Sequence, residues 1–267
     1  MLDLKQLTGD VCRIATEAGH FLKEERKNFR RESVVEKHAH DYVSYVDKES
    51  EVRIVKAISA LLPEAGFITE EGSATYQDEP YCWVIDPLDG TTNYIHDEAP
   101  YCVCIALRSR TELLLGVVYE VCRDECFCAW RGGRAFMNGE EIHVSGVRDI
   151  KDAFVFAELP YNAQQYKQTA LHLIDKLYGV VGGIRMNGSA AAAICYVAMG
   201  RFDAWAEAFL GKWDYSAAAL IVQEAGGRVT DFCGNGHFMD GHHIIATNGY
   251  LHSVYQQLIA EVPPLDM

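Results

Sequence analysis

Two aspartates three residues apart, Asp86 and Asp89, end an apolar run in the segment WVIDPLDGTTN. The residues before them, Tyr81 to Ile85, predict a buried strand that delivers both carboxylates to its carboxyl end. Ligand sites in layered α/β proteins gather at such strand ends. Two carboxylates this close repel each other unless they share a proton or a cation, and hard oxygen ligands suit Mg²⁺. The segment therefore predicts a metal site.

The residues around the second aspartate turn the chain and offer a place for an anion. Pro87 and Gly90 are expected to end the strand, and Gly90 lets the backbone approach a ligand closely. Thr91 and Thr92 can cap a following helix whose free N–H groups attract an anion. A metal and a phosphate would then occupy adjoining places. The alternative is an ordinary turn rich in Asp, Pro and Gly, and this segment alone leaves that alternative open.

Three other acidic positions lie next to predicted strand ends or helix starts. Glu70, with Glu71 beside it, follows a short strand, Asp47 opens a helix, and Asp214 directly precedes an apolar helix. Taken alone, each has an ordinary explanation: a solvated turn for Glu70, a charge at a helix start for Asp47, and an N-cap for Asp214. Their meaning depends on whether the fold brings them together.

The composition indicates a large folded unit with an excess of acidic residues. The chain has 267 residues, 49% of them hydrophobic, and no Pro/Gly/Ser-rich linker or repeat. This predicts one catalytic unit over residues 1–267, with approximate halves 1–148 and 149–267. The formal net charge of −14 argues against nucleic acid as a standing partner, because no run of Lys or Arg is present to offset phosphate repulsion. A phosphorylated metabolite would need metal cations to neutralise both itself and the site.

The N-terminal residues and the cysteines bear on the cellular compartment in which the protein is expected. The chain start lacks the basic and apolar regions of a signal peptide, and no apolar run approaches the roughly 18 residues of a membrane span. Nine cysteines, an odd number, in a protein too large to need disulfide staples indicate a reducing interior. We therefore expect the cytoplasm and no membrane partner. The spacing of Cys122, Cys126 and Cys128 matches no strong zinc pattern.

Hydrophobic periodicity predicts helices interleaved with strands, which implies a layered α/β sandwich. An amphipathic helix begins at Leu4, the polar stretch 30–41 is a loop or hairpin, and Asn138-Gly139 supplies a tight hairpin turn. A second helix is expected over Asp47 to Leu62, with the apolar stripe Val52, Val55, Ile58 and Leu62. Strands are expected over 66–69, 81–85, 101–107, 113–119, 125–130, near 154, and over 202–206, 228–231 and 244–246. Further helices are expected over 164–178, 189–199, 215–225 and from 250.

Four motifs occur in a fixed order over nearly the whole chain. They are Lys37-x3-Asp41-x-Val43-Ser44-x2-Asp47, Glu70-Glu71-Gly72, WVIDPLDGTTN, and Trp213-Asp214 followed by Ala225-Gly226-Gly227. Together they resemble the inositol monophosphatase family of magnesium-dependent, lithium-sensitive phosphatases. Thr92 favours this branch, because the related bisphosphate nucleotidases usually carry Lys at that position. The resemblance implies the αβαβα layered sandwich of inositol monophosphatases and fructose-1,6-bisphosphatases, a family in which homodimers are common.

The resemblance also implies a set of metal ligands. Two or three Mg²⁺ ions would be held by four carboxylates and one backbone carbonyl, those of Glu70, Asp86, Asp89, Asp214 and Leu88. Such ions stabilise attacking and leaving oxygens together and lower the pKa of bound water. In the family pattern Thr91 with Glu70 would orient and deprotonate the attacking water. Asp47 would act beside Thr91 or help to hold a third ion.

The substrate-binding residues follow from the same resemblance. The N–H groups of Gly90 and Thr91, with Thr92 beside them, would receive the phosphate. Glu207, seven residues before Asp214, would accept hydrogen bonds from substrate hydroxyls. The sugar or inositol side of the pocket would be lined by Gly188, Ser189 and Ala190. As ordinary alternatives, Glu207 is a solvated charge after a strand and Ser189 caps a helix.

One departure from the family pattern affects the expected substrate. Gly211 stands where many inositol monophosphatases have His, so a preference for inositol phosphate is in doubt. Arg185 or Lys212 could instead pair with a second phosphate. The alternative for each is an ordinary surface charge. The expected activity is magnesium-dependent hydrolysis of a small phosphate monoester, with inositol monophosphate first. Fructose 1,6-bisphosphate or a nucleotide (NADP or adenosine bisphosphate) is the alternative substrate, and a non-catalytic regulatory protein that binds a phosphorylated metabolite is the alternative of another class.

Overall fold

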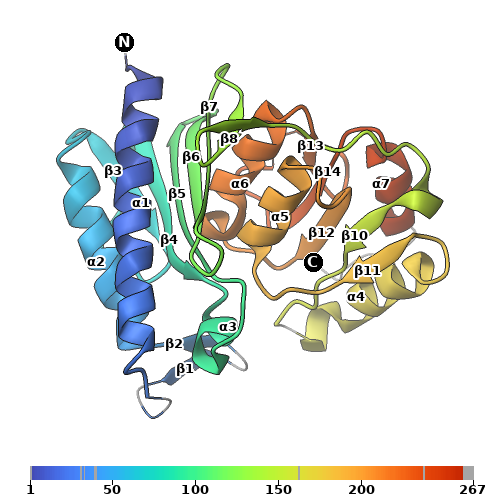
Figure 1. Cartoon of the computed structure of the whole chain (residues 1–267), viewed down its shortest axis with the longest axis horizontal. Helices are drawn as coiled ribbons and strands as arrows, with labels where there is room; N and C mark the ends of the chain where they lie inside the picture. Colours follow the sequence, from blue (N-terminus) through green and yellow to red (C-terminus); the bar gives the residue numbers. More distant parts are fainter. Residues whose placement is uncertain are drawn as a thin grey trace.

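The computed structural model describes residues 2–30, 32, 34–38, 41–161, 163–236 and 238–260. Its elements form two large sheets, a short hairpin and two pairs of helices that enclose the sheets, with a third pair between them (Figure 1). Among the described residues, no helix has the length and apolar character needed to cross a bilayer.

The first part of the chain supplies the hairpin and the larger sheet. Its helices are α1 (Leu4–Arg26), α2 (Tyr45–Ser59) and α3 (Thr91–His96). Its strands are β1 (Val35–His38), β2 (Asp41–Val43), β3 (Ala65–Thr69), β4 (Tyr81–Asp89), β5 (Cys102–Ser109), β6 (Leu113–Glu120), β7 (Glu125–Trp130), β8 (Ala135–Met137) and β9 (Glu140–Ile142). Strands β3 to β9 lie in sequence order in one seven-stranded sheet, antiparallel except for the parallel pair β3 and β4.

The second part supplies the smaller sheet and four helices. Its helices are α4 (Ala163–Leu177), α5 (Ala190–Ala198), α6 (Lys212–Glu224) and α7 (His252–Ala260), with a single 3₁₀ turn, η2, at Ile150–Asp152. Its strands are β10 (Phe154–Phe156), β11 (Gly183–Arg185), β12 (Ala204–Ala208), β13 (Arg228–Asp231) and β14 (His243–Thr247). They form a five-stranded mixed sheet in the order β11-β10-β12-β14-β13.

The elements stack in five layers. Helices α1 and α2 cover one face of the larger sheet, and α5 and α6 lie between the two sheets, where α6 packs on β4 to β7 (Figure 1). Helices α4 and α7 pack beside each other on the outer face of the smaller sheet. This order is the αβαβα sandwich that the resemblance implied.

Strand β5 shows why the larger sheet is buried on both faces. Its residues alternate between two cores: Val103 and Ile105 face α1 and α2, whereas Cys102 and Cys104 face α5 and α6. All four side chains are buried. A strand with helices on both sides reads as a continuous apolar run, as this one does. The two cysteines serve as small apolar residues on the crowded side, where α5 and α6 are themselves rich in alanine.

The predicted stripe of α2 is wrong in part. Ser44 caps this helix, which therefore begins two residues before the predicted start. Val52 is half exposed, and the buried face combines apolar side chains with Asp47, Ser50 and Glu51. A search for apolar periodicity cannot detect a face on which half of the buried positions are polar.

Two element boundaries also differ from expectation, and one strand was not predicted. Strand β4 continues past the predicted end at Ile85 through Pro87, because a register shift between Asp86 and Asp89 accommodates the proline. Helix α6 begins at Lys212, which is earlier than predicted. Strand β11 is three residues long and was not predicted. The hairpin alternative for the polar stretch 30–41 is confirmed by the pairing of β1 with β2, although residues 31, 33, 39 and 40 lie outside the described part.

Candidate active site

The end of β4 presents two aspartates from one irregular strand. Asp86 pairs with Cys104 and Asp89 with Cys102 on β5, and two residues separate the aspartates in a strand that would normally place one there. The amide of Leu88 donates to Asp86 Oδ1 over 2.9 Å. Pro87 has no amide hydrogen, so it is tolerated in this bulge. The irregularity turns both carboxylates toward the space between the sheets.

Gly90 follows directly and has a backbone conformation that only glycine adopts without strain. Its φ is +89°, and a Cβ atom there would lie 2.9 Å from the carbonyl oxygen of Pro100. Gly90 precedes the first turn of α3, and its carbonyl accepts from the Tyr94 amide over 3.0 Å. The sharp turn predicted at Gly90 is therefore present, and strand β4 continues up to it.

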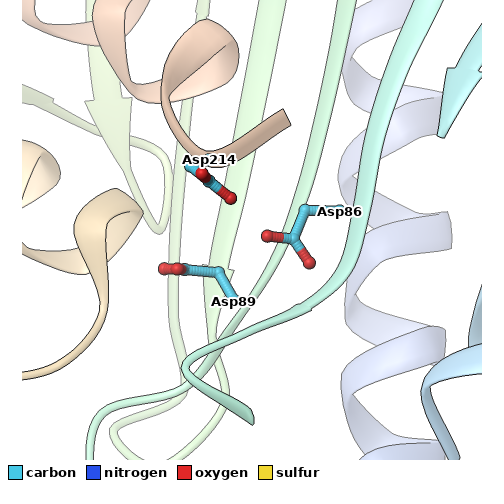
Figure 2. Close-up of side chains that lie close together, drawn as sticks. All are labelled: Asp86, Asp89 and Asp214. Atoms are coloured by element: carbon cyan, nitrogen blue, oxygen red, sulfur yellow. The ribbon is translucent and has the colours of Figure 1, made fainter. Parts of the chain in front are cut away.

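Asp214 reaches the same space from the opposite side. It lies in the first turn of α6, where its Oδ2 accepts from the Gly211 amide over 2.7 Å. It is therefore the third residue of the helix and not the N-cap. Ligand oxygens of Asp86, Asp89 and Asp214 lie within 4.8 Å of one another. Figure 2 shows the three side chains lying close together.

Burial and like charges make this cluster electrostatically unfavourable without a cation. Burial raises the pKa of Asp86 well above its usual range, and the charges of Glu70 and Asp89 raise it further. Burial also raises the pKa of Asp89 to about 6, against hydrogen bonds to its ionised form from Ser189 and Ala191. Hard oxygen donors held this close fit Mg²⁺.

Glu70 lies next to Asp86 and to a cation from the hairpin. Its carboxylate lies close enough to that of Asp86 for each to change the pKa of the other, and Lys37 Nζ on β1 lies 3.3 Å from Glu70 Oε1 and also bonds to Glu71. Burial raises the pKa of Glu70 to about 7, although the Lys37 charge acts to lower it. Glu51 on α2 fixes this turn, because its carboxylate accepts from the amides of Glu71 and Ser73 over 2.7 and 2.8 Å.

Asp47 connects the start of α2 with the turn after β4. Its Oδ2 accepts from the amide and hydroxyl of Ser44 over 2.9 and 2.7 Å, which completes a capping box. Its Oδ1 lies 3.2 Å from the hydroxyl of Thr91, which also lies 3.0 Å from the carbonyl of Leu88. Asp47 is fully buried. The Thr91 hydroxyl is thereby held beside the carboxylate cluster.

These residues line one cavity of about 140 Å³. Its lining includes nearly all of the predicted metal and substrate residues, namely Glu70, Asp86, Leu88, Asp89, Gly90, Thr91, Thr92, Gly188, Ser189, Ala190, Glu207 and Asp214. Asp47 stands behind Thr91 and does not line the cavity. The backbone of the 188–190 segment approaches Gly90, and the Ser189 hydroxyl donates to Asp89 Oδ2. The cavity thus joins residues from both halves of the sequence.

The two candidates for a second phosphate site lie elsewhere. The guanidinium of Arg185 stacks over the Phe154 ring at 4.7 Å and donates to the Ile184 carbonyl. Lys212 Nζ pairs with Asp240 over 2.7 Å. Neither residue is among the described residues that line the cavity, and these include no other Lys or Arg. The prediction that Arg185 contacts substrate gains no contact from the structure.

Sequence reasoning missed several residues of the cavity wall. Glu158 follows β10, is buried, and accepts from the Asn187 amide over 3.1 Å, so it holds the 187–190 segment. Burial raises the pKa of Glu158 to about 7, and burial with the Glu158 charge raises that of Glu207 well above its usual range. A carboxylate directly after a strand was the signal that could have found Glu158. Five further lining residues carry no polar pattern, namely Tyr42, Leu159, Tyr161, Phe209 and Leu210.

The comparison with protein families decides how to interpret this cavity. The model of the Inositol monophosphatase family matches residues 3–263. The chain belongs to the inositol monophosphatase family. The resemblance inferred from the four motifs is therefore confirmed.

Relatives and solved structures of the family agree with this assignment. A Pseudomonas aeruginosa protein named Nus factor SuhB is 39% identical over 243 residues, covering 89% of this chain and 90% of that protein. A Mesorhizobium japonicum protein named Inositol-1-monophosphatase is 34% identical, with the same coverage. The structure of inositol monophosphatase from Anabaena covers 99% of both chains with a TM-score of 0.88 and 29% identity. These structural matches confirm the predicted fold class.

Proposed function

We propose that the chain is a magnesium-dependent phosphatase that hydrolyses a small phosphate monoester. The observation that carries this proposal is the convergence of Asp86, Asp89 and Asp214 within 4.8 Å, with Glu70 beside Asp86, in one cavity. A cavity that gathers this much negative charge would repel a phosphate ester unless cations lie between them. The family assignment supports the same class of reaction.

Two or three Mg²⁺ ions, held by the carboxylates of Glu70, Asp86, Asp89 and Asp214 with the carbonyl of Leu88, would neutralise the phosphate and lower the pKa of water. The chain's own groups would position the reactants. The Thr91 hydroxyl, fixed by Asp47, would orient the attacking water, and Glu70 would accept its proton.

The reaction would be an in-line attack of water on phosphorus. The new bond joins the water oxygen to phosphorus, and the bond from phosphorus to the ester oxygen breaks, so the products are inorganic phosphate and an alcohol. The amides of Gly90 and Thr91 would receive the phosphate oxygens, and no covalent enzyme intermediate is expected. Trapping a phosphoenzyme on Asp86 or Asp89 would contradict this mechanism.

The alcohol side of the substrate would face hydrogen-bond acceptors. Glu158 and Glu207 line the cavity, and both favour donors such as hydroxyl groups. Inositol monophosphate meets this requirement and is our first choice. Fructose 1,6-bisphosphate and bisphosphate nucleotides are weaker choices, because Lys212 pairs with Asp240 and Arg185 lies over Phe154. We treat residues 1–267 as one catalytic unit, since Asp89 and Asp214 come from different halves of the chain.

The direct test is phosphate release by the wild-type protein with Mg²⁺ and after chelation with EDTA. The panel should contain inositol 1-phosphate, glycerol 2-phosphate, fructose 1,6-bisphosphate, NADP and adenosine 3′,5′-bisphosphate. We expect magnesium-dependent turnover with the two monophosphates in excess over the bisphosphates. A protein that binds Mg²⁺ but turns over none of the five would contradict the proposal.

Lithium provides an independent check. Li⁺ would compete for a weakly held Mg²⁺ position. Millimolar Li⁺ should therefore inhibit phosphate release, and additional Mg²⁺ should weaken that inhibition. Full activity in high millimolar Li⁺ would argue against this branch of phosphatases. We also propose a cytoplasmic location. We further propose a homodimer, and size-exclusion chromatography with light scattering would test this oligomeric state.

A second candidate function is regulatory, and one observation favours it. Relatives from Pseudomonas aeruginosa and Escherichia coli, 39% and 38% identical to this chain, are named Nus factors. If the regulatory role does not depend on catalysis, Glu70→Gln should abolish phosphate release and leave the regulatory effect of the protein in cells intact. Loss of both together would favour the enzymatic function alone.

A further inference from the structure

The mouth of the cavity is lined by three apolar side chains that remain about half exposed. Leu159, Tyr161 and Phe209 have exposed fractions of 52%, 49% and 48%. Leu159 and Tyr161 follow β10, and Phe209 follows β12, so the three come from two adjacent strand ends. We call the two aromatic residues, Tyr161 and Phe209, the aromatic lip. Large apolar side chains at the rim of a ligand site usually contact the ligand.

Phe209 is held in this position at an energetic cost. Its φ is +66°, in the left-handed region that a bulky residue rarely adopts. Its amide donates to His243 Nδ1 over 3.4 Å, and its ring lies 5.5 Å from that of Tyr166. A strained residue that buried its side chain in the core would be explained by packing. Phe209 leaves half of its surface exposed, so packing alone does not account for it.

The cavity is too small to enclose a whole ester. Its volume of about 140 Å³ is below the roughly 300–1,000 Å³ of common ligand pockets. Carboxylates that would hold the cations occupy its floor, so the phosphate fills much of the enclosed space. The alcohol portion would therefore extend to the mouth, between Glu158 and Glu207 and onto the aromatic lip. The described cavity lining contains no cation for a second acidic group on this alcohol.

We propose that, besides polyol monophosphates, the site accepts a phosphate monoester whose alcohol carries a flat aromatic ring, and that Phe209 and Tyr161 bind this ring. This inference rests on the phosphatase function proposed above and adds a substrate class to it. A flat ring can stack on an aromatic side chain or meet its edge, which a puckered hydrocarbon ring of equal size does less well. Phe209 acts here as a specificity-determining residue.

The test compares two esters that differ only in ring shape. They are 2-phenylethyl phosphate and 2-cyclohexylethyl phosphate, with glycerol 2-phosphate as a ring-free reference. We expect the wild-type ratio of kcat/KM, phenyl over cyclohexyl, to be about 5 to 10. Phe209→Gly should bring the ratio close to one, whereas Phe209→Tyr should retain it. Tyr178→Ala, at an 82% exposed side chain outside the cavity lining, is the control that should change neither ratio nor rate.

Unfolding of the variant can be separated from loss of the ring contact. Glycine is relaxed at positive φ, so Phe209→Gly should have a Tm equal to or above that of the wild type. A binding experiment also separates this inference from the phosphatase proposal. Calorimetry with 3-phenylpropylphosphonate and 3-cyclohexylpropylphosphonate, in which a methylene replaces the ester oxygen, should show the same preference and its loss in Phe209→Gly.

The possible outcomes are distinct. Hydrolysis of glycerol 2-phosphate with a wild-type ring ratio near one, or a ratio unchanged by Phe209→Gly, would overturn the role of the aromatic lip and leave the phosphatase function standing. A phosphonate preference that depends on Phe209, without hydrolysis of any ester, would support ring binding and overturn the phosphatase function.

Discussion

The carboxylate of Asp89 meets two opposed requirements. Its Oδ2 accepts from the Ser189 hydroxyl and, over 3.0 Å, from the Ala191 amide at the start of α5, which favours the ionised form. It also lies within 4.8 Å of Asp86 and Asp214, which disfavours that form. The fold therefore holds a charged group in a place where other negative charges repel it. A divalent cation would remove this conflict.

Substitution of Asp86 should separate the cost of repulsion from the gain on binding metal. In EDTA, Asp86→Asn should raise the free energy of unfolding by on the order of 1 kcal/mol, because one buried negative charge is removed. Magnesium at 100 times its Kd should stabilise the wild type by about 2.7 kcal/mol and the variant much less. Urea unfolding measures both values. Asp78→Asn, at an exposed pair with Arg110, is the control, and an equal magnesium gain in Asp86→Asn would refute the assignment.

Asp47 and Ser44 should have different consequences although they belong to one capping box. Ser44→Ala should lower the free energy of unfolding by about 1 kcal/mol and keep phosphate release within about threefold. Asp47→Asn should lower kcat by about 10²-fold, because asparagine has only one acceptor oxygen and cannot accept from both Ser44 and the Thr91 hydroxyl. Steady-state kinetics together with urea unfolding checks the pair. Equal effects of the two changes on kcat would reduce Asp47 to a helix cap.

Single site residues could be predicted from the sequence where polar side chains lie close together along the chain. The spacing of Asp86 and Asp89 predicted a metal site and the resemblance implied Asp214 as a further ligand; the structure brings the three carboxylates together although Asp214 lies 125 residues after Asp89. Phe209 and Glu158 show why the remaining wall was missed. One is an apolar residue whose role depends on its left-handed backbone, and the other is a single glutamate that gains its meaning only from the amide of Asn187.

The elements contact one another closely where small residues face a helix backbone. Gly116 lies on β6 beneath α6, and a Cβ atom there would lie 2.4 Å from the carbonyl oxygen of Ala217. Because α6 carries Asp214 in its first turn, the packing of this helix on the sheet also positions a carboxylate of the cluster. The contact thus joins the layer that holds Asp86 to the layer that holds Asp214.

Gly116→Ala should therefore destabilise the protein strongly. We expect a loss of about 2–3 kcal/mol in the free energy of unfolding, because the added methyl group pushes α6 from the sheet. Phosphate release should fall as well, since the displacement moves Asp214. Gly146→Ala adds a methyl group in open space and should leave stability nearly unchanged. Chemical denaturation of both variants tests the contact, and a stable Gly116→Ala protein would show that the layers repack easily.

Prediction of elements succeeded where apolar periodicity was strong and failed at polar or short segments. Strands β5 and β6 were found because both faces are buried and the apolar runs are continuous. The buried face of α2 was assigned incorrectly because Asp47, Ser50 and Glu51 belong to it. Strand β11 has three residues and only one neighbouring strand, so its sequence alone carries too little pattern to detect.

Across the whole molecule, stability should depend on the protonation of His252. This residue is buried at the start of α7, where Nε2 lies 2.9 Å from the Thr230 hydroxyl and Nδ1 lies 3.0 Å from the Thr247 hydroxyl. The Thr230 hydroxyl donates to the Asp231 carbonyl, so it accepts from Nε2, and Nδ1 accepts from Thr247. This arrangement suits the neutral ring. Burial lowers the pKa of His252 to about 4, and the Arg228 charge adds to the effect.

The sign of the pH dependence follows from this depressed pKa. Between pH 6.5 and 4 the unfolded chain binds a proton that the folded protein does not, so the contribution of His252 to stability is complete above pH 6.5 and disappears as the pH falls to 4. The full effect is about 3 kcal/mol. Comparing Tm against pH for the wild type and His252→Gln removes the contributions of the buried acids. Parallel curves in this range would contradict the assignment.

The architecture as a whole was predictable because it rests on repeated features. Interleaved apolar runs and the four ordered motifs indicated the αβαβα sandwich, which the family match and the Anabaena structure confirm. The location of the cavity between two halves was implied by the resemblance. The shape of its mouth was not, because the lip residues come from the two adjacent connections after β10 and β12.

The most direct test of the central claim is the rate of phosphate release from glycerol 2-phosphate in saturating Mg²⁺ by the wild type, Asp89→Asn and Asp214→Asn, with Asp78→Asn as the control. If the three clustered aspartates hold the catalytic cations, both cluster variants should lose at least about 10²-fold in kcat/KM, which corresponds to about 2.7 kcal/mol, while the control keeps the wild-type rate. A wild-type rate in Asp89→Asn, with the fold intact by circular dichroism, would show that hydrolysis does not take place at this cluster.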